Sequence, residues 1–341
     1  MKRKSAVDAN RVFFSSVILS QVLVSLIAAS GVTDRMVLQF LIQIFIASPA
    51  VAYLLLSGSS IKNGIGRLSV GLGECLLLIP FAFCAGKIAE FLNGVSLLFS
   101  VNTVGQNMAE RMLNHSFSVA FLVIAVMPAL CEEVVFRGVL YRNYRKSGVC
   151  VALILTAVLF GLMHMNLNQL LYAVVLGFLF AAVNEITGSV LPSVGLHLYI
   201  NGRSVVQLYG EVNYLKGLRE QYVATETVGD MEGMERISSL ADGVPIERGD
   251  WLQEYMTSTP ETVKEQVIQL LPWFLAAVAG TVVIVGLLLW CRKRRGTEQE
   301  RSLFGDGKEP AEKSGWRNVL SPTLFFGVLY CVAEMIGRLL M

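Results

Sequence analysis

Charge is scarce in this sequence. Only 16% of its 341 residues are Asp, Glu, Lys or Arg, against roughly one quarter in soluble globular domains. The formal net charge is only +2, which gives no reason to expect a nucleic-acid partner. Apolar residues make up 54% of the chain and the mean hydropathy is +0.58, so much of its surface must face lipid rather than water. The composition predicts an integral membrane protein.

Paired metal-binding and disulfide-forming residues are also lacking. The chain has three histidines and six cysteines, and no two cysteines form a CxxC pair, which excludes the usual spacing of a zinc knuckle. The HExxH pair of a membrane zincin is absent as well. The cysteines lie in or beside apolar runs, where free cysteine packs as a small hydrophobe. We therefore expect no cofactor on these grounds.

Long apolar runs dominate what is present. About 20 apolar residues at 1.5 Å per residue cross the hydrocarbon core as a helix. The candidate spans are Phe13–Ser30, Val37–Ser57, Cys75–Phe91, Phe117–Leu140, Val149–His164, Asn168–Ile186, Val190–Tyr209, Val267–Trp290 and Leu320–Leu340. The last contains Glu334 and Arg338, which leaves open whether it crosses the membrane or lies along its interface. The runs predict an all-α, polytopic membrane helix bundle with about eight or nine transmembrane helices.

Lysine and arginine placement predicts the orientation of these spans, because cytoplasmic segments are enriched in both residues. Counted from the N-terminus, four basic clusters fall on one side of the membrane. They are Lys2, Arg3, Lys4 and Arg11; Lys62 and Arg67; Arg142, Arg145 and Lys146; and Arg292, Lys293, Arg294 and Arg295. We expect a multi-pass protein of the cell membrane with a cytoplasmic N-terminus.

The same pattern divides the chain into four parts. Residues 1–116 are N-terminal transmembrane helices, and residues 117–209 are a helical core that carries the polar motifs described below. Residues 210–266 form an external polar insert with twelve acidic and five basic residues, within which we expect short helices at 216–219 and 230–236. Residues 267–341 combine C-terminal transmembrane helices with a cytoplasmic linker.

Ionisable residues inside the core spans are the strongest functional signal, since each costs roughly 2.5–3.5 kcal/mol at a helix centre on insertion scales. The first cluster is Glu132, Glu133 and Arg137. Glu133 and Arg137 are four residues apart, share a helix face and are expected to pair. Glu132 lies about 100° round the helix, which predicts a carboxylate without that partner.

Two further pairs share this four-residue helical spacing, Phe160 with His164 and His197 with Asn201. If the chain turns near Gly148, Glu132 and His164 are each about 24 Å from that turn and level with one another. We therefore expect the three clusters to converge in one cavity open to the cytoplasm. A carboxylate and an imidazole there can activate water, and a histidine with an asparagine amide can donate to an oxyanion.

At these residues the chain resembles the CAAX-protease and bacteriocin-processing family, also called the Abi family, with its motifs EExxxR, FxxxH and HxxxN. The resemblance covers about residues 117–209. It implies an intramembrane endopeptidase in which Glu132 and His164 activate water and His197 and Asn201 form the oxyanion hole. Glu133, Arg137 and Phe160 support the site. The implied partners are the lipid bilayer and a peptide or protein substrate, either a lipidated protein or a bacteriocin or leader peptide.

Three other interpretations stay open at this point. A zinc-dependent version of the same protease would take Glu132, His164 and His197 as ligands, because catalytic zinc uses three protein ligands. A non-catalytic membrane scaffold or bacteriocin-immunity factor would keep the fold without cutting peptides. A transporter is a weaker alternative, since buried ionisable groups also line proton paths.

Overall fold

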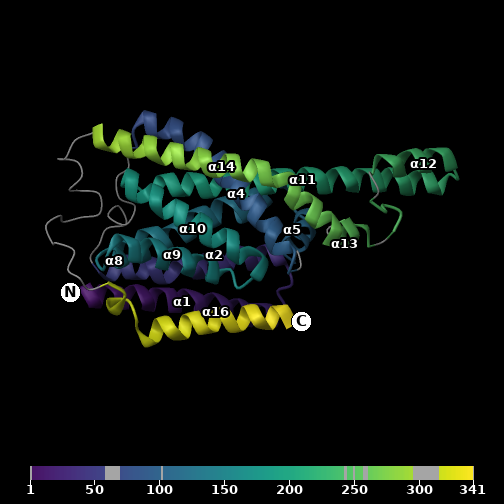
Figure 1. Ribbon diagram of the computed structural model, residues 1–341. Helices are drawn as coiled ribbons and strands as arrows, with labels where there is room; N and C mark the ends of the chain where they lie inside the picture. The colour runs from purple at the N-terminus through teal and green to yellow at the C-terminus, as the bar shows by residue number, and fades with distance from the viewer. Residues whose placement is uncertain are drawn as a thin grey trace.

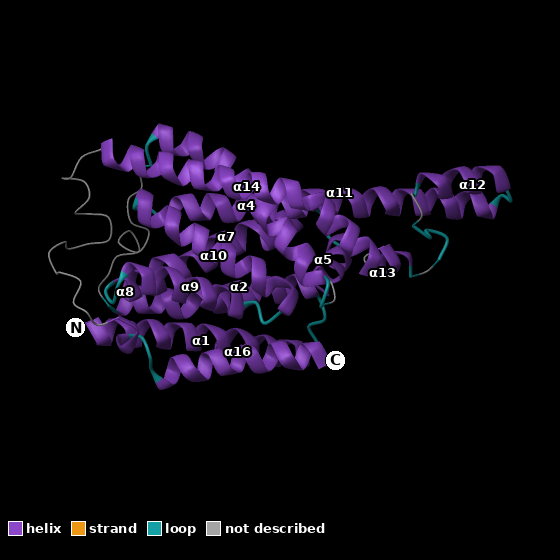
Figure 2. Cartoon of the chain, viewed as in Figure 1, coloured by secondary structure: helices purple, strands orange, loops and turns teal. Residues whose placement is uncertain are grey.

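The computed structural model describes residues 2–57, 70–100, 103–241, 244–248, 250–255, 260–294 and 315–340. Within these ranges the chain is a bundle of helices joined by short loops, and the described part contains no β-strand (Figure 2). The predicted all-α class is therefore confirmed.

The bundle is built from helices that follow the apolar runs of the sequence. In chain order they are α1 (Lys2–Ala29), α2 (Arg35–Leu56), α4 (Leu72–Leu97), α5 (Thr103–Leu113), α6 (Phe117–Phe121), η1 (Leu122–Val126), α7 (Met127–Glu133), η2 (Val134–Tyr141), α8 (Arg142–Arg145), α9 (Val149–Met163), α10 (Leu167–Thr187), α11 (Leu191–Thr227), α12 (Met231–Leu240), α13 (Trp251–Tyr255), α14 (Pro260–Arg294), η3 (Gly315–Asn318) and α16 (Pro322–Leu340). Each of the nine predicted spans coincides with one helix or with the continuous helical stretch 117–145.

Fewer of these helices have the length and composition of a membrane span than the sequence predicts. Among the described residues six do, namely Ser5–Ala29, Arg35–Leu56, Leu72–Leu97, Phe117–Arg145, Leu167–Thr187 and Glu261–Arg294. Helix α9 is apolar but has only 15 residues, because it ends just before His164. Helices α11 and α16 carry polar and charged residues within their apolar runs, such as Arg203 and Glu334. Six of the eight or nine expected spans therefore meet these criteria among the described residues.

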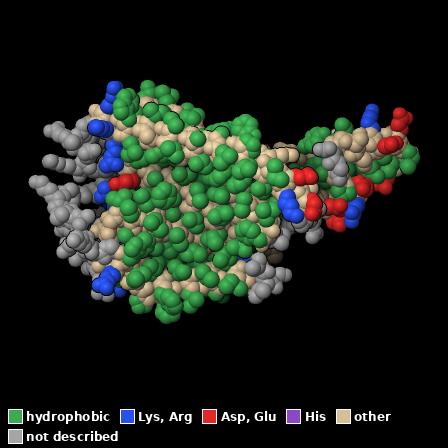
Figure 3. Space-filling model, viewed as in Figure 1, with side chains coloured by type: hydrophobic (Ala, Val, Ile, Leu, Met, Phe, Trp, Pro, Cys, Tyr) green, Lys and Arg blue, Asp and Glu red, His purple; other side chains and the backbone are tan. Residues whose placement is uncertain are grey.

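The surface has the pattern expected of a protein that sits in lipid. Hydrophobic side chains cover the middle of the face seen in Figure 3, with Lys and Arg at the end that holds the N-terminus. Asp and Glu gather toward the opposite end, where α11 projects from the bundle (Figures 1 and 3). Large side chains such as Leu72, Ile79 and Ile268 are exposed outward, as lipid-facing positions require. The protein is therefore a membrane protein.

The core of the bundle brings together segments that are far apart in sequence. Its largest apolar cluster joins Phe13 of α1, Leu54 of α2, Phe136 of η2, Leu159 of α9 and Cys331 of α16. Helices α1 and α16 lie side by side, as do α4 and α14 (Figure 1). The cysteines are free, as predicted; Cys331 is buried, whereas Cys75 and Cys150 are exposed.

Two glycines let α9 and α10 approach closely. A Cβ added to Gly161 would lie 2.4 Å from the Val174 side chain, and one added to Gly177 would lie 3.1 Å from the Ala157 Cα. Small residues at such contacts allow helix backbones in membranes to pack together. The contact holds α9, which carries Phe160, against the part of α10 that faces Arg137.

The external region differs from its prediction. Helix α11 does not end at Tyr209 but continues as one helix to Thr227, so no separate helix forms at 216–219. The reason is that residues 210–227 contain no proline and only two glycines, so nothing stops the helix. Helix α12 packs beside α11 (Figure 1) and confirms the expected helix at 230–236. Residues 242–243 of the insert and residues 295–314, where the cytoplasmic linker is expected, lie outside the described residues.

Candidate active site

Two π-helical segments flank the pair of glutamates. The stretch Phe117–Arg145 is helical throughout, but η1 before α7 and η2 after it have π rather than α hydrogen bonding. Pro128 begins α7, and proline lacks the N–H that an α-helix needs at that position. Wide π turns inside α-helices occur frequently at functional sites. Glu132 and Glu133 close the short α segment between them.

Glu133 and Arg137 form the buried ion pair that their spacing predicts. The Nη1 atom of Arg137 lies 3.0 Å from Oε1 of Glu133. Its Nη2 donates to the backbone carbonyl of Gly177 at 3.0 Å, and its guanidinium lies 4.6 Å from the ring centroid of Phe160. Both charged side chains are almost fully buried. This pair joins η2 to α10 and fixes the orientation of Glu133.

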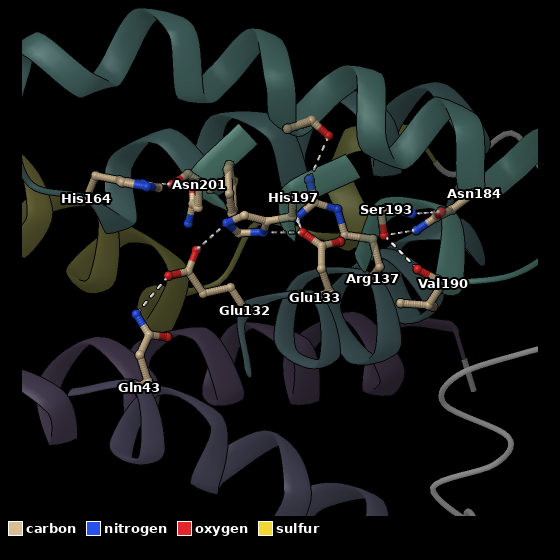
Figure 4. Close-up of polar contacts among 12 residues, drawn as sticks. Gln43, Glu132, Glu133, Arg137, His164, Asn184, Val190, Ser193, His197 and Asn201 are labelled. Atoms are coloured by element: carbon tan, nitrogen blue, oxygen red, sulfur yellow. Dashed lines mark hydrogen bonds and ion pairs between the residues drawn. The ribbon is translucent and has the colours of Figure 1, made fainter. Parts of the chain in front are cut away.

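His197 contacts both glutamates. Its Nδ1 lies 2.9 Å from Oε1 of Glu133, and its Nε2 lies 3.9 Å from Oε2 of Glu132 (Figure 4). Glu133, paired with Arg137, is a hydrogen-bond acceptor, so Nδ1 of His197 carries the hydrogen in that contact. Its Nε2 then faces Glu132, where it donates only when the ring is an imidazolium. The sequence prediction paired His197 with Asn201 and did not foresee its bond to Glu133.

Glu132 has a partner that the sequence prediction missed. Gln43, on α2, donates from Nε2 to Oε1 of Glu132 at 3.0 Å (Figure 4). As expected, Arg137 pairs with Glu133 rather than with Glu132, but the neutral partner Gln43 was not predicted. The two residues are 89 positions apart, so no local spacing connects them, and the one available signal was a glutamine inside an apolar helix. Glu132 remains the less buried of the two glutamates, with a side chain able to meet a substrate.

His164 lies at the end of α9 rather than inside a span. Its backbone N–H bonds to the Gly161 carbonyl, which leaves the Phe160 carbonyl without its usual α-helical donor. The His164 ring supplies that donor from Nδ1 at 2.8 Å. Because a carbonyl only accepts, Nδ1 carries a hydrogen and Nε2 of the neutral ring is an acceptor. The next residue, Met165, has a φ of 48°, a strained conformation of the kind that clusters at active sites.

Phe160 links the two histidines. Its ring centroid lies 5.1 Å from that of His164 and 5.8 Å from that of His197. Its backbone carbonyl also holds His164, as described above. The FxxxH spacing thus has a physical reason, because position i−4 supplies the carbonyl for the histidine ring. Within the described structure no hydrogen bond or ion pair joins His164 directly to Glu132, and their equal depth stays a prediction.

Asn201 is tied to the helix that carries the glutamates. Its Nδ2 donates to the Ile124 carbonyl at 3.2 Å. Four residues after Ile124 stands Pro128, which has no N–H to offer that carbonyl, and the asparagine amide takes its place. The second hydrogen of this amide is not used by that contact. Figure 4 shows Asn201 on the Glu132 side of His197, as the predicted convergence requires.

The donor atoms of the site do not form a ready metal site. Within the described ranges, no group of three or more His, Cys, Asp or Glu side chains is placed to hold a metal ion. Glu132, His164 and His197, the set named for zinc, make hydrogen bonds to Gln43, the Phe160 carbonyl and Glu133, respectively. These bonds use one carboxylate oxygen and the two Nδ1 atoms, so the zinc alternative stays an untested prediction.

The fold and site together define a class. An apolar-belted helix bundle with a carboxylate, two imidazoles and an amide between its helices is compatible with a membrane-embedded hydrolase. Comparison with known proteins agrees. Residues 114–203 match the family model of the type II CAAX prenyl endopeptidase Rce1-like proteins.

A bacterial relative gives the same result over a longer stretch. The chain is 27% identical over 184 residues to a protein of Bacillus subtilis (strain 168) named "Putative membrane peptidase YdiL", covering 50% of this chain and 72% of the relative. No solved structure matches the chain. Both matches support the predicted resemblance to the CAAX-protease family and an intramembrane peptidase activity.

Proposed function

We propose that the protein is an endopeptidase of the glutamate type, with Glu132 as general base and His164 as its partner in holding water. The observation that carries this proposal is the division of labour between the two glutamates. Glu133 is fixed by Arg137 and His197, whereas Glu132 makes one hydrogen bond, to Gln43. Its other oxygen is left for chemistry.

The proposed reaction begins with a water molecule between Glu132 and Nε2 of His164. The Glu132 carboxylate and Nε2 of His164 are both acceptors, so each accepts a hydrogen bond from one hydrogen of the water. A lone pair of the water oxygen then faces the peptide carbonyl. As the oxygen attacks the carbonyl carbon, its proton moves to Glu132 and the carbonyl oxygen becomes an oxyanion. The C–N bond then breaks and the proton passes from Glu132 to the leaving amine. The products are a carboxylic acid and an amine, as hydrolysis requires.

The oxyanion is assigned to Asn201 and His197. Asn201 has one amide hydrogen that is not held by Ile124, and His197 donates from Nε2 when it is an imidazolium held at Nδ1 by Glu133. Removing one such donor in other hydrolases costs about 10²–10³ in kcat. We assign Glu133, Arg137 and Phe160 to positioning. Phe160 contacts His164 and His197, and Arg137 holds Glu133, which in turn binds His197.

The proposed substrate is a peptide or protein presented from the cytoplasmic face, either lipidated or a bacteriocin or leader peptide. The described basic residues Arg142, Arg145, Lys146, Arg292 and Lys293 favour a cytoplasmic position for the end that holds the N-terminus. The opposite end carries the acidic insert. Cleavage of the insert by protease added outside intact cells, with the N-terminal end protected, is the expected outcome for this orientation.

The function is tested by Glu132→Gln in cells. Peptide termini are compared by mass spectrometry between cells with the unaltered protein and cells with the variant, expressed at equal levels in the membrane. We expect a set of termini that disappears with Glu132→Gln and with His164→Ala. Identical termini in all three strains would refute the peptidase mechanism and favour the scaffold or immunity function.

A further inference from the structure

Gln43 is a polar side chain in an otherwise apolar part of α2, the stretch Phe40–Ala47. Its side chain is only 3% exposed. A buried amide is costly unless its hydrogen bonds are made, and the other buried positions on this helix are filled by Met36, Ile46, Ala50 and Leu54. The position of this glutamine therefore needs a specific reason.

The amide is half satisfied. Its nitrogen donates to Oε1 of Glu132 at 3.0 Å, but its carbonyl oxygen is buried without a hydrogen-bond partner. Buried acceptors nearly always have a partner, and an exception calls for an explanation such as a bound water. The unpartnered oxygen of Gln43 belongs to the same amide whose nitrogen binds Glu132. A water beside the Glu132 carboxylate could therefore donate a hydrogen bond to this oxygen.

Glu132 depends on this contact for its orientation. Nε2 of His197 lies 3.9 Å from Oε2 of Glu132, and this distance is too long for a hydrogen bond. Glu133, by contrast, is held by both Arg137 and His197. Gln43 also lies outside the segment that matches the family model, residues 114–203, so that match does not assign it a role.

We propose that Gln43 is the positioning residue of the Glu132 carboxylate and part of the water site. It donates to one carboxylate oxygen and thereby turns the other toward the attacking water. Both hydrogens of that water are taken by Glu132 and His164, so the Gln43 carbonyl accepts a hydrogen bond from a second, neighbouring water. This inference rests on the proposed function of Glu132. It assigns to α2, in the N-terminal part of the chain, a direct share in the site.

The competing interpretation is that Gln43 only holds α2 against α7. Hydrogen bonds between membrane helices contribute modestly to stability, and such a role would affect folding rather than turnover. The two roles predict different kinetics. A positioning residue lowers kcat with little change in KM, because it acts on the reacting groups rather than on substrate binding.

The experiment uses the full-length purified protein and a synthetic peptide that spans a bond identified by the comparison of peptide termini. Gln43→Met keeps the length of the side chain and removes its hydrogen bonds. We expect kcat to fall roughly tenfold or more, as for loss of a hydrogen bond to a charged group, with KM within about twofold. Gln43→Glu places a second carboxylate beside Glu132 and should lower kcat further.

The matched control is Gln39→Met, one turn earlier on α2. Gln39 accepts a hydrogen bond from Arg111 at 3.1 Å and has no contact with the site, so its kcat should stay unchanged. Thermal unfolding of each variant separates loss of fold from loss of turnover. If Gln43→Met does not fold, Gln43→Asn keeps the amide but withdraws it by one methylene, and the same fall in kcat is expected.

The outcomes separate this inference from the function on which it rests. A lower melting temperature for Gln43→Met with an unchanged kcat would overturn the positioning role alone, provided that Glu132→Gln is inactive. If no peptide terminus depends on Glu132, the proposed function fails and the inference fails with it. In the double variant Glu132→Gln/Gln43→Met, the residual rate should equal that of Glu132→Gln.

Discussion

Two groups of charged side chains lie within the apolar helices, and they differ in how far they are shielded from water. The inner group is Glu133, Arg137 and His197, in which the Arg137 side chain is 1% exposed and the Glu133 side chain 0%. The outer group is Lys87, Glu90 and Arg203, where Glu90 is 30% exposed and receives both basic side chains. The same residue types thus occupy two very different environments.

The difference shows which charges the fold cannot do without. In the inner group each charge has a near neighbour of opposite charge, and the Gly177 carbonyl and three aromatic rings also surround Arg137. Removing one partner leaves an uncompensated charge where water cannot replace it. In the outer group the side chains are partly exposed, and exposed ion pairs contribute little to stability. Three substitutions test this comparison.

The largest effect is expected for Arg137→Met. The change leaves Glu133 buried without its main counter-charge, and breaking a buried pair in this way costs about 3–5 kcal/mol. We expect a large fall in the melting temperature of the purified protein in detergent. The double variant Glu133→Gln/Arg137→Met removes both charges and should be less destabilised than the single one. Equal losses would show that the charge of Glu133 is not what the fold must compensate.

A smaller effect is expected for Glu90→Gln. Lys87 and Arg203 lose their shared carboxylate, but both are partly exposed, so we expect a loss of about 1 kcal/mol or less. Peptidase activity should be retained, because none of these residues contacts the site. Lys87→Gln, which keeps the Arg203–Glu90 pair, is the control and should lose less still. A loss as large as that of Arg137→Met would remove the distinction between the two groups.

The smallest effect is expected for Glu110→Gln at the surface. Glu110 pairs with Arg35, and its side chain is 53% exposed, so the free energy of unfolding should change by no more than about 0.5 kcal/mol. Repeating the measurement at about 1 M salt should abolish even this difference, since the screening length falls to about 3 Å. A difference that persists at high salt would mean that the pair is shielded more than its exposure indicates.

The sequence was sufficient for the helices and for contacts within one turn of a helix. Apolar runs placed the spans, and the four-residue spacing predicted the Glu133–Arg137 pair. Helices α7 and α11 bring Glu132 near His197, and Asn201 lies on the same side of His197 (Figure 4). These successes share one cause, which is that helix geometry alone relates the residues involved.

The remaining features depend on packing between distant segments. Gln43 meets Glu132 only because α2 lies against α7, and His197 binds Glu133 because α11 crosses α7 at that depth. No local spacing specifies either contact. The continuation of α11 to Thr227 has a different cause. The residues after Tyr209 are polar, but they include no signal that stops a helix.

The bond between Asn201 and the Ile124 carbonyl has a consequence for how the site would meet a substrate. An asparagine side chain ordinarily rotates about two bonds, and a donor that must first find its orientation loses entropy at each encounter. Here the Asn201 amide donates to the Ile124 carbonyl, to which Pro128 has no N–H to offer. This bond restricts the rotation of the asparagine side chain before a substrate binds. Phe160 and Glu133 do the same for the two imidazole rings. The site is therefore preorganised, so a peptide arriving from the membrane would meet donors and acceptors that have already settled into their directions.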